Sequence, residues 1–224
     1  MKLNHSRSVW ILGALLLSLA ALPVAAQERT HSNPSFEVTI TNLTQGQIFA
    51  PPVVFSHRGS YKLFTPGEPA IAELAGVAED ADNAPLIALL GTEPRVGDVS
   101  SGDDVVMPGA HTTVRVSSRG GARYITVLGM LVTSNDAFFA GKIQVFGYPT
   151  STYAMAWDAG SEANTQDCLH IPGPPCGNPG VRVEDGAEGY VYIHAGIQDR
   201  GSLDPAIHDW RNPVAKIEIR RARR

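Results

Sequence analysis

Three acidic residues stand out because each lies among small or amide residues at the end of an apolar segment: Asp136, Asp158 and Glu162. Asp158 and Glu162 are four positions apart, and Gly160 between them lets the chain curl so that both carboxylates face the same way. Three carboxylates that meet away from water repel one another unless a cation holds them. Calcium takes about six to eight oxygen ligands and suits such a cluster. The spacing indicates a calcium site as one interpretation and solvated loop acids as the other.

Enzymatic chemistry has weaker support in the sequence. The histidines that invite a metalloenzyme or copper interpretation show no H-E-x-x-H or H-x-H spacing: His57, His170, His194 and His208. No serine stands in a G-x-S-x-G turn, which a serine hydrolase of that class needs. Asp136 and Glu162 could imitate the two carboxylates of a glycosidase. A hydrolase that uses these acids or nearby histidines is therefore the alternative to a non-enzymatic binding domain.

The cysteines Cys168 and Cys176 flank a segment rich in proline and glycine, which disfavours helix and strand. In an oxidising compartment, an isolated pair this close in sequence predicts a disulfide bond. The competing interpretation is a metal pair completed by His170, but soft metal sites usually need more ligands than this stretch supplies.

The first residues of the chain predict export. Lys2 and Arg7 precede an apolar run from Val9 to Leu22, and small residues follow at 24–26. This order is typical of a secretory signal peptide, with cleavage expected after Ala26. A membrane anchor is the alternative, but the run is shorter than the roughly 20 residues that span a bilayer. We expect a secreted or periplasmic protein with no transmembrane segment after cleavage.

The charge of the chain limits the kinds of partner that it can bind. The chain has a formal net charge of −4, although Lys2 and Arg7 fall in the predicted signal peptide and four arginines crowd residues 220–224. The body between them is therefore clearly acidic, which argues against nucleic acid as a partner. The arginine-rich end is interpreted as a solvated tail, with docking onto anionic envelope polymers as a second interpretation.

The elements that must position these residues are mostly strands. Alternating or β-branched runs predict strands over 36–43, 112–117, 124–132, 152–157, 190–194 and 214–219. The run at 124–132 is almost continuously apolar, which is typical of a central strand buried on both faces. Residues 48–55 contain Pro51 and Pro52 and are expected at a sheet edge. One helix is expected from Pro69 to Ala81. An all-β, antiparallel β-sandwich with one or two short helices fits this pattern.

Three motifs resemble the spondin-type domain, the N-terminal domain of F-spondin and mindin, which also occurs as a single exported domain in bacteria. They are Leu131-Val132-Thr133-Ser134-Asn135-Asp136-Ala137-Phe138, Trp157-Asp158-Ala159-Gly160-Ser161-Glu162, and Asp209-Trp210-Arg211-Asn212-Pro213-Val214-Ala215. The similarity runs from about Phe36 to Ile219. The resemblance implies one spondin-type domain over 35–220, and the residue patterns outside it predict a signal peptide over 1–26, a flexible leader over 27–34 and a basic tail over 221–224.

The resemblance implies a C2-like sandwich that binds one calcium ion through Asp136, Asp158 and Glu162. The animal pattern has aspartate where this sequence has Glu162, and glutamate needs slightly more room. By the same analogy, the protein is expected to be a non-enzymatic module for binding or adhesion. Its partner would be an extracellular or envelope protein or a polysaccharide, and the analogy does not extend further.

Overall fold

The computed structural model describes Met1, residues 33–146 and residues 150–223. The predicted signal peptide beyond Met1 and the leader up to Ser32 lie outside the described residues. Residues 33–223 form one compact unit. Within the described part of the chain, no helix is long and apolar enough to cross a membrane.

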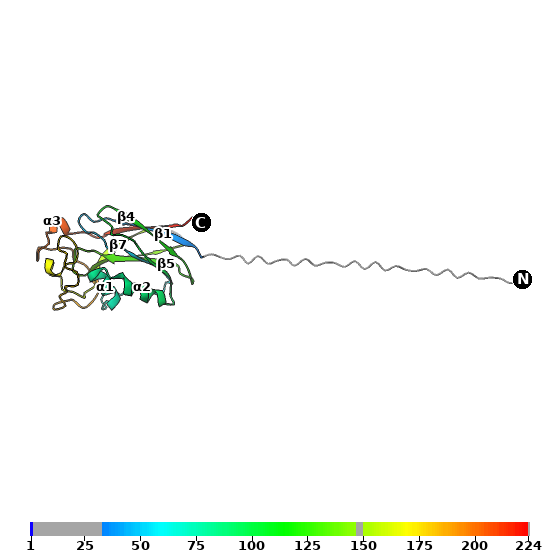
Figure 1. Ribbon diagram of the computed structural model, residues 1–224, viewed down its shortest axis with the longest axis horizontal. Coiled ribbons are helices and arrows are strands. Elements are labelled where there is room, and N and C mark those ends of the chain that lie inside the picture. Colours follow the sequence, from blue (N-terminus) through cyan, green and yellow to red (C-terminus); the bar gives the residue numbers. More distant parts are fainter. Residues whose placement is uncertain (2–32, 147–149, 224) are drawn as a thin grey trace. The chain divides into compact units, whose positions relative to one another are not determined.

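The described unit is mostly antiparallel β-structure, as predicted, with a few short helices (Figure 1). The strands are β1 (Ser35–Asn42), β2 (Val53–His57), β3 (Val96–Ser101), β4 (His111–Ser117), β5 (Tyr124–Met130), β6 (Ala137–Gln144), β7 (Ser151–Asp158), β8 (Tyr192–Ile193) and β9 (Ala215–Arg221). The helices are α1 (Ala72–Asp80), α2 (Asn83–Thr92), the short α3 (Pro205–His208) and the 3-10 turn η1 (Cys168–His170).

Hydrogen bonds join the strands into one sheet in the order β3-β2-β5-β6-β7-β9-β1-β4, with β8 added to β7. Strand β7 changes partner along its length: Ser151 to Ala154 pair with β9, and Met155 to Asp158 pair with β6. The two outer strands approach each other, since the N–H of Ser117 on β4 donates to Asp98 on β3 at 2.7 Å. The sheet is therefore nearly closed into a barrel.

The barrel interior is filled by the inward-facing side chains that the alternating patterns predicted. On β1, Phe36, Val38 and Ile40 are buried, and the residues between them are half-buried. Strand β5 lies between β2 and β6, and its outer face is covered as well. The prediction of a central strand buried on both faces is confirmed.

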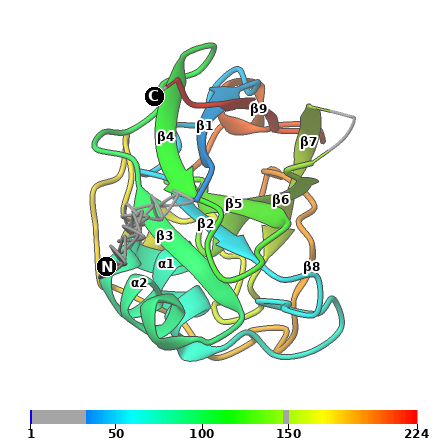
Figure 2. The same ribbon diagram turned by 90° about the vertical axis from the view of Figure 1, so that its right-hand side faces the viewer.

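A second apolar layer separates the outer face of β2, β5 and β6 from helices α1 and α2. The layer contains apolar side chains of both helices and all three strands: Leu74, Val77, Leu86 and Leu90, and Phe55, Leu128 and Phe138. Figures 1 and 2 place both helices on this side, with β1, β4 and β9 opposite. Helix α1 begins three residues after the predicted Pro69, and α2 was not predicted as a helix. Its N-cap is the side chain of Asp82, which accepts a hydrogen bond from the N–H of Ala84.

One prediction about the sheet is wrong. Residues 48–55 were expected at an edge because proline cannot donate to a ladder. Strand β2 instead lies between β3 and β5, because it begins at Val53, just after the two prolines. The edge beside it is β3, a polar and half-buried strand without a strong apolar pattern.

Candidate functional site

The sheet brings Asp136 and Asp158 together at one end of the barrel. Asp136 directly precedes β6, and Asp158 is the last residue of β7. Ala137 and Asp158 are paired in the ladder, and the N–H of Ala159 donates to the carbonyl of Asp136 at 3.1 Å. Two residues that are distant in sequence therefore become neighbours because β6 and β7 are adjacent antiparallel strands.

The segment after Asp158 turns back over this end of the sheet. Oδ1 of Asp158 accepts the N–H of Gly160 at 2.8 Å, an Asx turn that begins the curl. Gly160 has φ +67°, and a Cβ there would overlap the backbone carbonyl of Tyr190. Glycine is therefore required twice over at this position, by its backbone conformation and by the close approach of another chain segment.

The carboxylate of Asp136 lies inside this turn and is completely buried. Its Oδ2 accepts the N–H groups of Ser161 at 2.8 Å and Glu162 at 3.1 Å. Its Oδ1 is buried and accepts no hydrogen bond from the residues that the structure describes. Burial, and after it the negative charge of Asp158, raise the pKa of Asp136 well above its ordinary value. A buried carboxylate with one oxygen unpartnered is costly unless a proton or a cation compensates it.

Asp158 is also completely buried and belongs to a network of polar side chains. Its Oδ2 accepts the side-chain N–H of Asn164 at 2.6 Å and lies 3.6 Å from Nε2 of His194. Burial raises the pKa of Asp158 to about 6, although hydrogen bonds from Asn164, Tyr192 and the Gly160 backbone act in the opposite direction. Burial also raises the pKa of Tyr192, helped by the charge of Asp158, so the phenol stays protonated.

His194 is buried and neutral. Burial lowers its pKa to about 4. Nδ1 of the ring accepts the N–H of Gly196 at 2.9 Å, so Nε2 carries the proton and donates to Oδ1 of Asn164 at 3.0 Å. Both ring nitrogens are therefore engaged within the protein. The ring also packs against Trp210, with centroids 4.8 Å apart.

Glu162 reaches Asp136 through its backbone, whereas its carboxylate has other partners. Its Oε1 accepts the N–H of Val183 at 2.9 Å. Burial, and then the charge of Glu79, raise the pKa of Glu162 to about 7, while Arg182 lowers it. Arg182 lies 2.5 Å from both Glu79 and Asp80 of α1, although the Glu79 contact lacks the alignment of a hydrogen bond. This arginine compensates part of the negative charge around Glu162.

The three predicted ligands thus lie at the same end of the barrel but separate into a pair and a single residue. The negative charges of Asp136 and Asp158 repel each other, whereas Glu162 belongs to the acidic group around Arg182. Within the described residues, no group of three or more histidine, cysteine, aspartate and glutamate side chains is arranged to hold a metal ion. A cation at Asp136 and Asp158 would therefore draw further oxygens from amides, backbone carbonyls or water.

Sequence reasoning missed the polar side chains that fix this loop. Asn135 accepts the N–H of Gln166 at 3.0 Å, and Gln47 binds both backbone groups of Thr133. Asn164 connects Asp158 to His194. Single asparagine and glutamine residues form no recognisable motif in a sequence. Only their burial and contacts in the folded protein identify their structural role.

The third motif closes the same end of the barrel. Asp209 and Arg211 form an ion pair, and Asp209 also accepts the N–H of Ile197 at 3.0 Å. Asn212 accepts the N–H of Ala156 on β7 at 2.7 Å. Trp210 is buried in the core.

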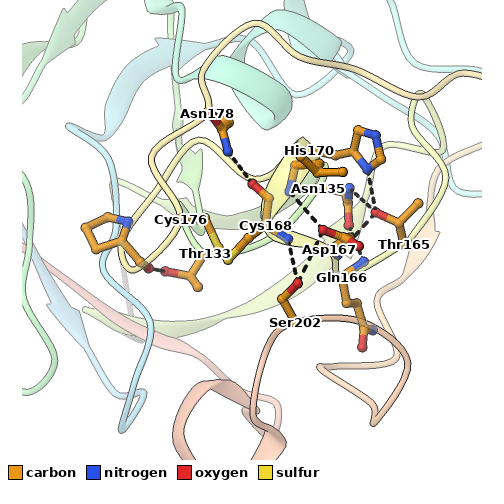
Figure 3. The surroundings of a disulfide bond; sticks show 12 residues. Thr133, Asn135, Thr165, Gln166, Asp167, Cys168, His170, Cys176, Asn178 and Ser202 are labelled. Carbon is orange, nitrogen blue, oxygen red and sulfur yellow. Dashed lines mark hydrogen bonds between the residues drawn. A yellow bond between two sulfur atoms is a disulfide. The ribbon is translucent and has the colours of Figure 1, made fainter.

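The predicted disulfide between Cys168 and Cys176 is confirmed, with Cα atoms 4.7 Å apart. Figure 3 shows how hydrogen bonds anchor the loop that it closes. Thr133 donates to the carbonyl of Pro174 at 2.7 Å, and Asn178 donates to the carbonyl of Cys168 at 2.6 Å (Figure 3). The disulfide loop therefore rests on the residues that precede Asp136.

No protein-family model matches this chain, and no curated protein matches it either. The resemblance to the spondin-type domain therefore stays a prediction from the three sequence motifs.

Proposed function

We propose that this protein is an exported, calcium-stabilised, non-enzymatic domain for binding or adhesion, with a C2-like sandwich architecture. The change of partner along β7 is compatible with that architecture, because one strand can serve two packed layers. The signal-peptide pattern and the disulfide support an oxidising location, where free calcium is also abundant.

The observation that carries the calcium proposal is Oδ1 of Asp136, a buried carboxylate oxygen that has no hydrogen-bond donor among the described residues and lies near a second buried carboxylate. Backbone N–H groups already satisfy Oδ2, so the fold holds Asp136 in place while leaving one oxygen for another ligand. Oxygen donors that carry negative charge fit a hard cation such as calcium.

In this proposal, Asp136 and Asp158 supply the charge, and Glu162 is the third predicted ligand. The bound ion would neutralise the repulsion between the carboxylates and fasten the start of β6 to the turn after β7. Its role is to stabilise the loops at this end of the barrel. Those loops would then present a fixed surface to an extracellular protein or an envelope polysaccharide.

Isothermal titration of the exported, purified protein with calcium after EGTA treatment tests this function, with magnesium as the competing ion. We expect one calcium ion per chain and a higher melting temperature. Asp136→Asn should abolish both, whereas Asp104→Asn, an exposed loop residue, should abolish neither. Absence of calcium binding at millimolar concentration would overturn the proposal.

The hydrolase alternative has one observation in its favour, the contact between Asp158 and His194 beside a polar hollow of about 240 Å³. Both ring nitrogens of His194 form hydrogen bonds within the protein, which argues against His194 as a general base. Turnover of ester or glycoside substrates that is lost in His194→Ala but kept in His111→Ala, an exposed histidine, would establish the enzyme instead.

A further inference from the structure

A separate pocket of about 250 Å³ opens on the outer face of the sheet, beside the layer covered by the helices. Strands β2, β5, β6 and β7 form its floor, and residues 61–64 form its opposite wall. Trp157 of β7 lines it, and because successive side chains of a strand alternate, Trp157 and Asp158 face opposite ways. The pocket is thus distinct from the acidic site.

The walls of this pocket are mainly aromatic, and a small residue creates the space. Phe64 and Trp157 meet with ring centroids 5.3 Å apart, and Phe55 contributes from β2. Ala140 of β6 lies between the larger side chains and is only half-buried. A volume of this size lies just below the roughly 300–1,000 Å³ of drug-sized sites, so one flat ring system would fill it.

The rim of the pocket is positive. Lys62 and Lys142 both line it, and its lining contains no aspartate or glutamate. Neither lysine forms an ion pair with any residue that the structure describes. Burial, and then the charge of Lys62, lower the pKa of Lys142, so the two ammonium groups are close enough to repel each other. Nζ of Lys142 also lies 4.4 Å from the centre of the Tyr124 ring, which holds it at the rim.

His57 and Thr126 of the floor are already hydrogen-bonded, whereas Nε1 of Trp157 is buried and has no hydrogen-bond partner among the residues that the structure describes. His57 bonds the carbonyl of Arg58 through Nδ1 at 2.7 Å and the hydroxyl of Thr126 through Nε2 at 2.9 Å. Burial lowers the pKa of His57, so the ring is neutral. The floor therefore offers apolar and aromatic surface, and the unpaired charge lies only at the rim.

We propose that this pocket binds a small aromatic carboxylate, with its ring between Phe64, Trp157 and Ala140 and its carboxylate between Lys62 and Lys142. Apolar burial supplies most of the affinity. The carboxylate relieves the repulsion between the lysines and selects anions over neutral molecules of the same shape.

Calorimetric titration of the exported protein with three probes tests the proposal: 2-naphthoate, the neutral 2-naphthamide and the cationic 2-naphthylmethylammonium. We expect 2-naphthoate to bind most tightly, with a submillimolar Kd, and the cation most weakly. The double variant Lys62→Gln/Lys142→Gln should weaken 2-naphthoate about tenfold and leave 2-naphthamide unchanged. Lys216→Gln, which removes a lysine paired with Glu218 elsewhere, should change neither.

Ala140→Leu should fill the pocket and abolish binding of both 2-naphthoate and 2-naphthamide, and circular dichroism shows whether it folds. The lysine variant alters only exposed side chains and keeps the test decisive if Ala140→Leu does not fold. Equal affinity for the three probes, no binding of 2-naphthoate at millimolar concentration, or an unchanged Kd in the lysine variant would each overturn the proposal.

Discussion

The backbone N–H of Ser161 donates a 2.8 Å hydrogen bond to Oδ2 of the buried Asp136. With the N–H of Glu162, it makes the turn after β7 depend on a carboxylate that precedes β6. The same carboxylate is the principal candidate ligand for calcium. In the proposed calcium site, loop structure and ion binding would be coupled through this one side chain, and substitutions there should separate the two roles.

Asp136→Asn is expected to raise the stability of the calcium-free protein at pH 7.5. Asparagine keeps an oxygen that can accept the two backbone N–H groups, while it removes the repulsion with Asp158. Asp136→Ala removes the acceptor and should destabilise by about 1–3 kcal/mol. Urea denaturation in EGTA measures both, and an Asn variant as destabilised as the Ala variant would contradict the repulsion argument.

The stability of the calcium-free protein should fall as pH rises from about 5 to 8. Folding raises the pKa of Asp158 to about 6 and that of Glu162 to about 7, and it also raises the pKa of Asp136. In this range the folded state binds more protons than the unfolded state, so increasing pH favours unfolding. The contribution of Asp158 alone is on the order of 3 kcal/mol.

Chemical denaturation of the parent protein and of Asp158→Asn at several pH values checks this dependence. The difference between their stabilities gives the contribution of this one carboxylate. The variant should show a flatter pH profile. Calcium should stabilise the parent protein more at pH 8 than at pH 5, since only ionised carboxylates bind the ion well. A calcium effect independent of pH would argue against these ligands.

Gly160→Ala should destabilise by more than about 3 kcal/mol, because it combines a positive φ with overlap against the Tyr190 backbone. Gly189→Ala is a matched control, since Gly189 has φ +79° but nothing within 4 Å of an added Cβ. It should cost only about 1–2 kcal/mol. Thermal unfolding of both variants provides the comparison, and equal losses would show that the close approach is unimportant.

Replacing both Cys168 and Cys176 by serine should lower stability by roughly 2–3 kcal/mol, because the disulfide closes a short loop. Reduction of the parent protein with dithiothreitol should reproduce the loss, and the double variant should not respond to it. Calcium affinity should fall modestly as well, because this loop contacts Thr133, close to Asp136. Unchanged stability on reduction would mean that the loop is ordered without the bond.

Regular elements were predictable where the sequence shows an alternating or a continuously apolar pattern. The alternation on β1 and β9 and the apolar run of β5 follow directly from the side that each presents to the core. Strand β3 was missed because its residues are polar and half-buried, so its conformation depends on pairing with β2. Helix α2 was missed because its apolar residues do not follow a clear amphipathic stripe.

The candidate site was predictable in its residue types and only partly in its arrangement. Asp136, Asp158 and Glu162 were identified from the sequence and the family resemblance, and all three are buried at one end of the barrel. The orientation of the Glu162 carboxylate toward Val183 and Arg182 was not predictable, because those residues lie in a loop about 20 positions further along the sequence. The contacts of Asn164 and His194 with Asp158 were likewise not predictable from the sequence.

From its residues alone, the chain could be predicted to be mostly antiparallel β-structure, to pair Cys168 with Cys176 and to curl at Gly160. These follow from local pattern, chain proximity and backbone conformation. The folded protein was needed to reveal that Asp136 meets Asp158, that one oxygen of Asp136 has no donor among the described residues, and that Lys62 and Lys142 flank an aromatic pocket. Such contacts depend on which strands become neighbours, and that depends on the burial of the whole core rather than on any one segment.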